Sequence, residues 1–344
     1  MGRKGPAPAM IGRAVEPVYR AVLAHRNRAF DAGRGVERVD VPVISIGNLS
    51  VGGTGKTPMV MWVVERLRAL GRSPAIAMRG YGAKRDGVSD EQAEYLDRFP
   101  GIPVVAQPDR IAGLRGLDQG SFDCVVLDDG FQHRRIARDL DIVLIDATRD
   151  AFADRCLPAG WLREPVDSVA RAGAVVITRS DLVDAALVAQ MEHAVRAIAP
   201  RMVIGRAVHA WDRLGIVDPT GAHREAPVAW MRGQRIVVAC GIANPEAFAA
   251  QVARAGAAIL GTVALPDHAP WSEADVARVA ALASGADGIV VTEKDWVKIR
   301  GRHGAWSVPV VRPRLEMDLG ASGDAIGALV EKAIQGRGAG TMPA

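Results

Sequence analysis

A glycine-rich segment followed by a lysine and a threonine is the strongest chemical signal in the sequence. It reads GNLSVGGTGKT over residues 47–57, directly after an apolar run and directly before a helical pattern. Glycines allow several backbone N–H groups to converge on phosphate oxygens, and a helix that begins near Lys56 adds the positive end of its dipole. The Lys56 ammonium can reach the β- and γ-phosphates, and the Thr57 hydroxyl suits Mg²⁺. We therefore predict that nucleotide phosphates are bound by Gly52, Gly53, Thr54, Gly55, Lys56 and Thr57.

The loop departs from the most common phosphate-loop pattern at its first glycine, where this chain has Ser50. The remaining GGTGKT is closer to a variant found in some dimerising ATPases. Those ATPases carry a signature lysine at the position that Val51 occupies here, and its absence counts against that group. A regulatory or chaperone-type ATPase or GTPase remains the alternative interpretation of the loop.

A second cluster of chemistry-bearing residues follows another apolar run. The stretch CVVLDDGFQHRR over residues 124–135 places Asp128 and Asp129 at the end of a predicted strand. Phosphate-loop enzymes present an acidic residue to Mg²⁺ or its waters from such a strand end, so we predict that both aspartates are metal ligands. His133 and the arginines after it suit an anionic ligand, and we predict that His133 binds substrate. The alternative is a solvated loop with internal ion pairs.

Apolar runs that alternate with helical patterns supply the frame for both clusters. Candidate strands cover residues 41–46, 73–77, 104–106, 124–127, 142–145 and 174–177, and helical patterns cover 57–70 and 183–198. Buried strands that alternate with helices indicate a mostly parallel sheet covered on both faces. Such sheets bind ligands beyond the C-terminal ends of their strands. The predicted fold is therefore α/β, a P-loop NTPase-like, mostly parallel sheet flanked by helices.

The pattern of the chain changes after residue 200. Short β-like runs around a turn at 218–221 predict a β-hairpin linker, and a second series of strands and helices predicts a smaller α/β domain. The final residues are glycine-rich and are expected to fray. The predicted organisation is an N-terminal segment over 1–35, the phosphate-loop core over 36–202, the linker over 203–232, the smaller domain over 233–335 and a flexible tail over 336–344.

The composition is that of an ordinary globular protein. The chain has 344 residues, of which 49% are apolar and 24% charged, which excludes a disordered or fibrous protein. Its three cysteines, Cys124, Cys156 and Cys240, are far apart, which argues against structural zinc and suits a reducing cytoplasm. The net charge of +4 suits an anionic ligand but is too small for a dedicated nucleic-acid binder, so no nucleic-acid partner is expected.

The segment before the first strand has an amphipathic pattern. Ile11, Val15, Val18 and Val22 recur at helical spacing, while arginines fall on the opposite side. Pro17 must start or kink a helix there. Two interpretations stay open on composition alone: a helix that packs on the domain, or a helix that lies on an anionic membrane surface. No run approaches the roughly 18 apolar residues of a spanning helix.

Taken together, the motifs resemble those of one family, the tetraacyldisaccharide 4′-kinases of lipid A biosynthesis. The resemblance covers about residues 10–300 and rests on GNLSVGGTGKTP, RGYGAK, DDGFQHRR, LPAGWLREP, GIANPEAF, PDH and TEKDWVK, in this order. It implies ATP-dependent phosphoryl transfer to the 4′-hydroxyl of an acylated glucosamine disaccharide 1-phosphate, with ATP and Mg²⁺ as cofactors. It also implies a peripheral position on the cytoplasmic face of the bacterial inner membrane, with the N-terminal segment dipping into the lipid surface.

The resemblance implies two catalytic residues besides Lys56. The family's acceptor-activating acid stands in a Gly-Asp-Glu-Pro segment, and the matching residues here are SDEQ, which makes Asp90 the candidate. The chain departs from that segment at Ser89 and Gln92. His268, in the PDH motif, matches the histidine that partners this acid. Because the two residues would lie in different domains, domain closure would assemble the pair and exclude water.

Further site residues carry over from the same motifs. Tyr81 in RGYG would line the site near the acceptor or phosphate, while Arg110 and Arg163 would bind the anionic substrate. Glu164, directly after Arg163, would join the Mg²⁺–nucleotide shell. Each of these residues has an ordinary alternative as a member of a surface ion pair. Residues 292–295 and 178–181 superficially resemble segments that read the purine base, and their alternative role is to cap helices.

Overall fold

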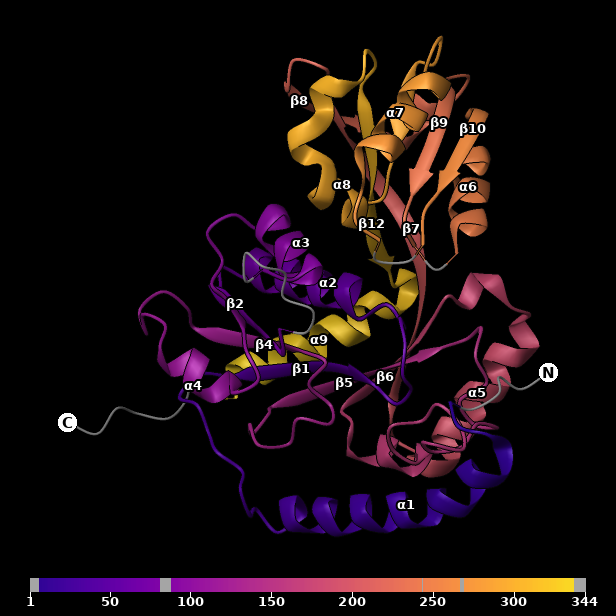
Figure 1. Cartoon of the computed structure of the whole chain (residues 1–344). Helices are drawn as coiled ribbons and strands as arrows, with labels where there is room; N and C mark the ends of the chain where they lie inside the picture. Colours follow the sequence, from indigo (N-terminus) through magenta and orange to yellow (C-terminus); the bar gives the residue numbers. More distant parts are fainter. Residues whose placement is uncertain (1–5, 81–87, 243, 267–268, 337–344) are drawn as a thin grey trace. The chain divides into compact units, whose positions relative to one another are not determined.

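The computed structural model describes residues 6–80, 88–242, 244–266 and 269–336 of the chain (Figure 1). These residues form two compact units. Unit 1 consists of the described residues up to His209 together with those from Met317 onward, and unit 2 is Ala210–Glu316. The phosphate loop and the aspartate pair both belong to unit 1.

Unit 1 is built on a parallel sheet with the phosphate-loop strand at its centre. All pairings between its strands are parallel, and the strands predicted from the sequence are confirmed within two residues. Across the sheet the order is β3 (Val104–Ala106), β2 (Pro74–Met78), β4 (Cys124–Asp128), β1 (Val43–Asn48), β5 (Leu140–Asp146), β6 (Ala174–Thr178) and the first part of β7 (Val203–Val217).

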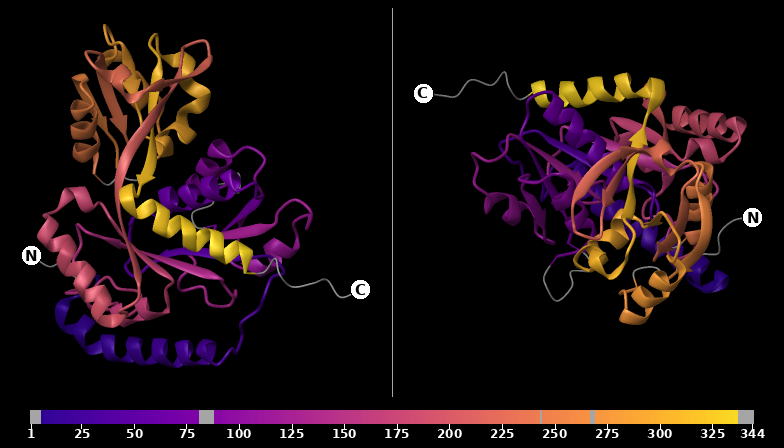
Figure 2. Two further views of the ribbon diagram at one scale, coloured as in Figure 1. Left: turned by 180° about the vertical axis from the view of Figure 1, so that it is seen from behind. Right: turned by 90° about the horizontal axis from the view of Figure 1, so that it is seen from above.

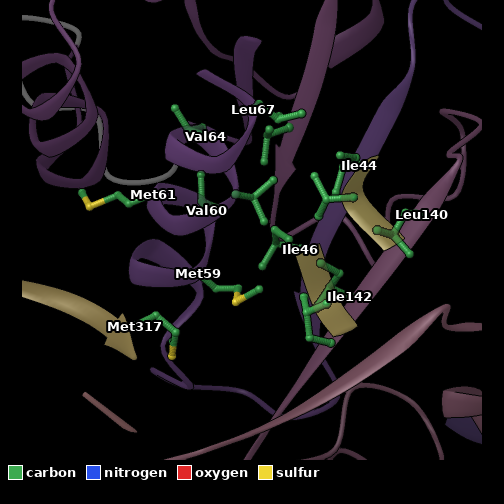
Figure 3. Packing of buried hydrophobic residues seen from close by; sticks show 14 of the residues in the cluster. Ile44, Ile46, Met59, Val60, Met61, Val64, Leu67, Leu140, Ile142 and Met317 are labelled. Atoms are coloured by element: carbon green, nitrogen blue, oxygen red, sulfur yellow. The ribbon is translucent and has the colours of Figure 1, made fainter. Parts of the chain in front are cut away.

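Both faces of this sheet are covered, because successive side chains of a strand point to opposite faces. On one face Ile44 and Ile46 of β1 are fully buried in a cluster with Met59 and Leu67 of α2 (Lys56–Ala69), as Figure 3 shows. This cluster fixes the direction of α2, whose first turn follows the phosphate loop. The predicted sheet flanked by helices is confirmed.

The opposite face is covered by α4 (Arg110–Arg115) and α5 (Ala185–Ile198). Ile111 of α4 packs in a cluster with Leu127 of β4, and Val195 of α5 packs against the β5 and β6 part of the sheet. The short α4 was not predicted, since it is only one to two turns long and carries two arginines and a glycine.

The C-terminal helix α9 (Gly323–Gln335) also belongs to unit 1, so the structure differs from the predicted domain boundaries. Its Ile326 and Val330 lie in the same core cluster as the α2 side chains, and α9 crosses the strands on the α2 face (Figure 2). Glu331 pairs with Arg66 of α2. An amphipathic pattern shows that a helix is covered on one side, but it does not reveal which sheet covers it.

Unit 2 is a smaller parallel α/β unit, as predicted. Its helices include α6 (Pro245–Arg254), α7 (Glu273–Leu282) and α8 (Glu293–Ile299). The antiparallel hairpin of β7 and β8 (His223–Pro227) turns at Asp218, whose carboxylate accepts the N–H of Thr220 at 2.8 Å. The parallel strands run in the order β10 (Ala258–Ala264), β9 (Arg235–Cys240), β11 (Gly288–Val290) and β12 (Val310–Asp318).

The N-terminal segment is a single helix, α1 (Ala9–Asp31), that continues through Pro17. It packs on unit 1 through Gly12, Glu16 and Leu23, which are buried, and not through its apolar stripe. That stripe faces outward, with exposed fractions of 87% for Met10, 60% for Ile11, 44% for Val15, 64% for Val18 and 62% for Val22. Among the described residues, no helix combines the length and the apolar character needed to cross a membrane.

Candidate active site

The polar side chains of the site meet at one edge of the unit 1 sheet. Because the strands are parallel, the carboxyl ends of β1, β4, β5 and β6 all lie at this edge. The phosphate loop follows β1, Asp128 ends β4, Asp146 ends β5 and Thr178 ends β6. Ligands of open α/β sheets bind at such an edge, as the sequence analysis predicted.

Two glycines of the phosphate loop are required by its backbone. Gly52 has a φ of 115° and Gly55 a φ of 91°, which side chains of L-residues rarely adopt. A Cβ on Gly52 would also lie 2.5 Å from an Nη of Arg149, and one on Gly55 would lie 2.5 Å from Nε2 of His209. The conformation of the loop therefore places the first turn of α2, whose N–H groups have no partner within the helix, at the sheet edge.

The Lys56 ammonium lies in a network of charges centred on Asp129. Its Nζ is 3.6 Å from Asp129 Oδ1, and Nη1 of Arg163 donates to both carboxylate oxygens at 2.8 and 2.7 Å. The guanidinium of Arg110, only 1% exposed, donates to the Asp129 carbonyl at 3.4 Å. Burial opposes ionisation of Asp129, but Lys56 and Arg163 outweigh it and lower the pKa of this carboxyl. Asp129 is therefore ionised and holds Lys56 and Arg163 beside the loop.

Asp128 is the more deeply buried aspartate, with 4% of its surface exposed. Its Oδ2 accepts from the Tyr95 hydroxyl at 3.0 Å, and Tyr95 also hydrogen-bonds to the Thr57 side chain. Burial, aided by the charge of Glu91 and opposed by Lys56, raises its pKa to about 6. Asp128 Oδ1 is buried and has no hydrogen-bond partner in the described structure. A buried carboxylate oxygen beside a threonine hydroxyl fits Mg²⁺, which prefers oxygen ligands.

Glu164 directly follows Arg163, the residue that pairs with Asp129. It is fully buried, its Oε2 accepts from Asn27 of α1 at 2.9 Å, and it pairs with Arg171 at 3.0 Å. Across the residues that the structure describes, no three His, Cys, Asp or Glu side chains form a group that could hold a metal ion. Oε1 of Glu164 is buried and, like Asp128 Oδ1, has no hydrogen-bond partner in the described structure, so the inclusion of Glu164 in the Mg²⁺ shell stays a prediction.

Two of the remaining predicted residues, Asp90 and His133, lie in the described part of unit 1. Asp90 begins α3 (Asp90–Arg98), the helix whose Tyr95 reaches Asp128. Nε2 of His133 is buried without a described partner, and burial together with the charge of Arg110 lowers its pKa to about 4, so this imidazole is neutral at neutral pH. Tyr81 and His268 lie outside the described residues.

The segment 292–295 has a structural role in unit 2. The carboxylate of Asp295 is fully buried and accepts from Gly241 N at 2.9 Å, Trp271 Nε1 at 3.2 Å and Thr292 Oγ1 at 2.7 Å. Thr292 caps α8 by accepting from Asp295 N at 3.1 Å. Because its acceptors are used within the unit, the purine-reading interpretation of Asp295 is not supported, and the capping alternative holds.

Sequence analysis did not predict that three cationic or basic side chains lie against the phosphate loop, although Arg179 belongs to the segment 178–181 considered above for base reading. Arg149 and Arg179 donate to loop carbonyls, and the His209 imidazole lies beside Gly55. Arg149 lies three residues after the end of β5, and Arg179 follows directly after the end of β6. Both arginines come after buried parallel strands whose carboxyl ends lie at the same sheet edge as the loop, and this position was the available signal that they lie near it.

His209 makes unfolding of the chain sensitive to acid. Burial, reinforced by the charge of Arg179, lowers its pKa from 6.5 to about 4. Between these values the unfolded chain binds a proton that the folded chain excludes, so the free energy of unfolding falls as the pH falls, by about 2 kcal/mol at about pH 5. We expect His209→Gln to lose less stability than the parent between neutral pH and pH 5, measured by urea unfolding. Equal losses in the two proteins would contradict this.

Comparisons with known proteins identify the family of the chain. The family model of the tetraacyldisaccharide-1-P 4′-kinases (LpxK) matches residues 9–333. The chain is 38% identical to the tetraacyldisaccharide 4′-kinase of Geobacter sulfurreducens over 91% of each chain, and 41% identical to that of an Anaeromyxobacter species over 83% of this chain and 81% of the relative. The structure resembles that of LpxK from Aquifex aeolicus in complex with ATP, with a TM-score of 0.73, 25% identity and coverage of 93% and 98%. The chain therefore belongs to the tetraacyldisaccharide-1-phosphate 4′-kinase family.

Proposed function

We propose that the protein is an ATP-dependent kinase that transfers the γ-phosphate of ATP to the 4′-hydroxyl of tetraacyldisaccharide 1-phosphate, a step of lipid A biosynthesis. The observation that carries this proposal is the juxtaposition at one sheet edge of the phosphate loop, the Lys56–Asp129–Arg163 network and the buried Asp128. The family membership supplies the identity of the acceptor.

The phosphate loop and its cations perform the transfer by binding the phosphates and stabilising charge. The transition state of phosphoryl transfer is loose, and catalysis depends on positioning and electrostatics. Lys56 extends from the first turn of α2 and is paired to Asp129 at 3.6 Å, a separation that leaves the ammonium able to reach a phosphate. Arg163, held on the same carboxylate, adds a second cation for the anionic substrate.

We assign Mg²⁺ to Thr57 and Asp128, with Asp129 beside them. When bound, the ion neutralises charge on the β- and γ-phosphates and fixes their orientation. Tyr95 holds the Asp128 carboxylate through Oδ2, so Oδ1 keeps one direction. Asp129 keeps its ion pairs with Lys56 and Arg163 and acts on the site through them.

We propose Asp90 as the group that accepts the proton of the sugar hydroxyl. A carboxylate of ordinary pKa is a weak base toward an alcohol, but it can take the proton late in a loose transition state if it is within hydrogen-bond reach. The attachment of α3 to Asp128 through Tyr95 supports this role, since it ties the helix that begins with Asp90 to the phosphate site. Arg110 and His133 would bind the anionic part of the acceptor.

We further propose that the protein lies on the cytoplasmic face of the bacterial inner membrane, with α1 in the lipid surface. The support is the outward apolar stripe of α1, because the helix packs on unit 1 through its other side. That side is anchored, since Tyr19 donates to the Arg163 carbonyl at 2.9 Å and Arg155 pairs with Glu16 at 2.7 Å. An amphipathic helix of this kind binds at the boundary between headgroups and acyl chains.

The membrane proposal predicts a loss of vesicle binding when the stripe is made polar. Replacing Val18 and Val22 together by serine removes two valine side chains from the lipid surface, which weakens partition into vesicles with anionic lipids by at least about tenfold. Co-sedimentation measures this, with Leu182→Ser as the control because Leu182 is also exposed, at 53%, but lies outside α1. Equal sedimentation of all three proteins would contradict the proposal.

The experiment that tests the proposed activity is transfer of label from γ-labelled ATP to tetraacyldisaccharide 1-phosphate in the presence of Mg²⁺. We expect labelled lipid with a phosphate ester at the 4′ position and one ADP formed per product. Hydrolysis of ATP with the acceptor present and unphosphorylated would contradict the proposal and favour the regulatory ATPase.

A further inference from the structure

The carbonyl groups of the phosphate loop are bound from behind by side chains. Asn48, the last residue of β1, donates its Nδ2 hydrogens to the carbonyls of Ser50 at 2.8 Å and Gly52 at 3.4 Å, and to Thr54 Oγ1 at 2.9 Å. Thr178, the last residue of β6, donates its hydroxyl to the Thr54 carbonyl at 2.9 Å. Both donors come from ends of strands, so the sheet itself holds part of the loop.

Two arginines bind the carbonyls of residues 51 and 53, which alternate with the carbonyls bound by Asn48 and Thr178. Arg149 donates to the Val51 carbonyl at 3.3 Å, and Arg179 donates to the Gly53 carbonyl at 3.0 Å. Every carbonyl from residue 50 to residue 54 therefore receives a side-chain donor. Both guanidiniums also pair with Asp146, at 3.6 Å for Arg149 and in a close hydrogen bond for Arg179.

Asp146 is placed to orient both arginines. It ends β5, next to the loop-bearing β1, and is 3% exposed. Its Oδ1 accepts from the N–H and the hydroxyl of Thr148 at 3.0 and 2.7 Å, so the carboxylate is fixed while Oδ2 faces the guanidiniums. A buried carboxylate with two arginines is a compact polar network in which each member keeps the others in place.

Binding of the carbonyls determines where the loop amides point. In a trans peptide the C=O and the following N–H lie in one plane and point in opposite directions. When the carbonyls of residues 50–54 are bound by these side chains, the N–H groups of residues 52–55 are directed to the other side of the loop, while the N–H of Val51 donates to the Trp161 carbonyl at 2.8 Å. A loop held in this way does not lose conformational freedom when it binds phosphate, and such preorganisation increases affinity.

We propose that Asp146, Arg149 and Arg179 are positioning residues that hold the phosphate loop in its binding conformation, and that the two arginines act through the loop carbonyls and not as phosphate ligands. This inference rests on the proposed nucleotide binding by the loop. The Asp146 charge offsets one of the two arginine charges, and the described polar contacts of both guanidiniums at the loop are with its carbonyls and with Asp146.

The charge on Asp146 separates this inference from direct phosphate contact by the arginines. Asp146→Asn keeps an oxygen for Thr148 but removes the group that orients the arginines, so we expect ATP and ADP to bind about tenfold more weakly, each by the same factor. If the arginines instead bound phosphate, removal of a nearby negative charge would leave binding unchanged or strengthen it. Calorimetric titration of the full chain with ATP and with ADP measures this.

Combined substitution tests whether Asp146, Arg149 and Arg179 act as one unit. Once Arg149 and Arg179 are both methionine, Asp146→Asn should weaken nucleotide binding by no more than about twofold further. Thr178→Val, which removes an independent donor to the Thr54 carbonyl, should weaken ATP and ADP equally, and Thr178→Ser should restore the affinity. Arg196→Gln, at an exposed pair on α5, is the control for loss of an arginine.

The outcomes are distinguishable from failure of the proposed function. If the parent chain binds neither ATP nor ADP, nucleotide binding by the loop is wrong, and this inference falls with it. If the parent binds both and Asp146→Asn binds them as tightly or more tightly, or loses ATP alone, the positioning role is wrong while the kinase assignment stands.

Discussion

Phosphoryl transfer by Lys56→Ala is expected to be roughly 10²–10³-fold slower than by the parent, the effect of removing one preorganised charge donor from a reaction centre. The ammonium is the side-chain cation that extends from the phosphate loop itself, and Asp129 at 3.6 Å keeps it there. The other basic residues of α2, Arg66 and Arg68, are in its last turn, at the opposite end of the helix from the phosphate loop. Initial rates with labelled ATP and saturating acceptor measure the loss.

A matched control for this variant is Lys332→Ala, which removes an exposed lysine from the last turn of α9 in the same unit. It should transfer phosphate at the parent rate and show that loss of a lysine charge alone is harmless. Thermal unfolding of both variants checks that the fold is intact. Parent-like transfer by Lys56→Ala would mean that the loop does not hold the reacting phosphates.

The second large effect is expected for Asp90→Ala, which should lower turnover by about 10²–10³-fold while ATP binds as in the parent. The reason is that Asp90 lies outside the phosphate loop, at the first position of α3, and is proposed to act on the acceptor. Turnover at saturating ATP and calorimetric ATP affinity separate the two effects. A variant that lost ATP affinity and turnover together would contradict a role confined to the acceptor.

The neighbouring Glu91→Gln is the sharpest control for Asp90. Glu91 and Tyr95 are one helical turn apart, so they share a face of α3, and the charge of Glu91 acts on Asp128 and raises its pKa. Glu91 is thus a carboxylate that faces the same site. We expect Glu91→Gln to change turnover by less than about tenfold. If it instead abolished turnover while Asp90→Ala retained it, the assignment of the base would be wrong.

The parts of the site that could be predicted from sequence are those that buried strands position. The apolar runs before Gly47 and before Asp128 could only be strands of a covered parallel sheet, and parallel strands bring their carboxyl ends together. Lys56, Thr57 and Asp128 were therefore placed correctly at one edge. The geometry of the loop follows as well, because Gly52 and Gly55 have backbone conformations that favour glycine.

The parts that could not be predicted depend on contacts between residues far apart in the chain. Nothing in the local sequence shows that Arg163 pairs with Asp129, that Glu164 pairs with Arg171, or that Tyr95 reaches Asp128. The helix that carries Tyr95 has only nine residues, five of which are charged, so the segment offers few apolar residues from which a helix could be predicted.

The N-terminal helix shows the same limit in another form. Its apolar residues were identified, but periodicity does not distinguish a face covered by protein from a face left exposed. The structure covers the face that contains Gly12, Glu16 and Leu23 and leaves the apolar stripe open. The contacts of Tyr19 and Asn27 with residues 163 and 164 decide between the two orientations.

The most direct test of the central claim is a crystal structure of the full chain with a non-hydrolysable ATP analogue and Mg²⁺. The account predicts that the β- and γ-phosphates lie against the N–H groups of residues 52–57, with the Lys56 ammonium in contact with them. Phosphates bound elsewhere on the chain, with this loop empty, would contradict it.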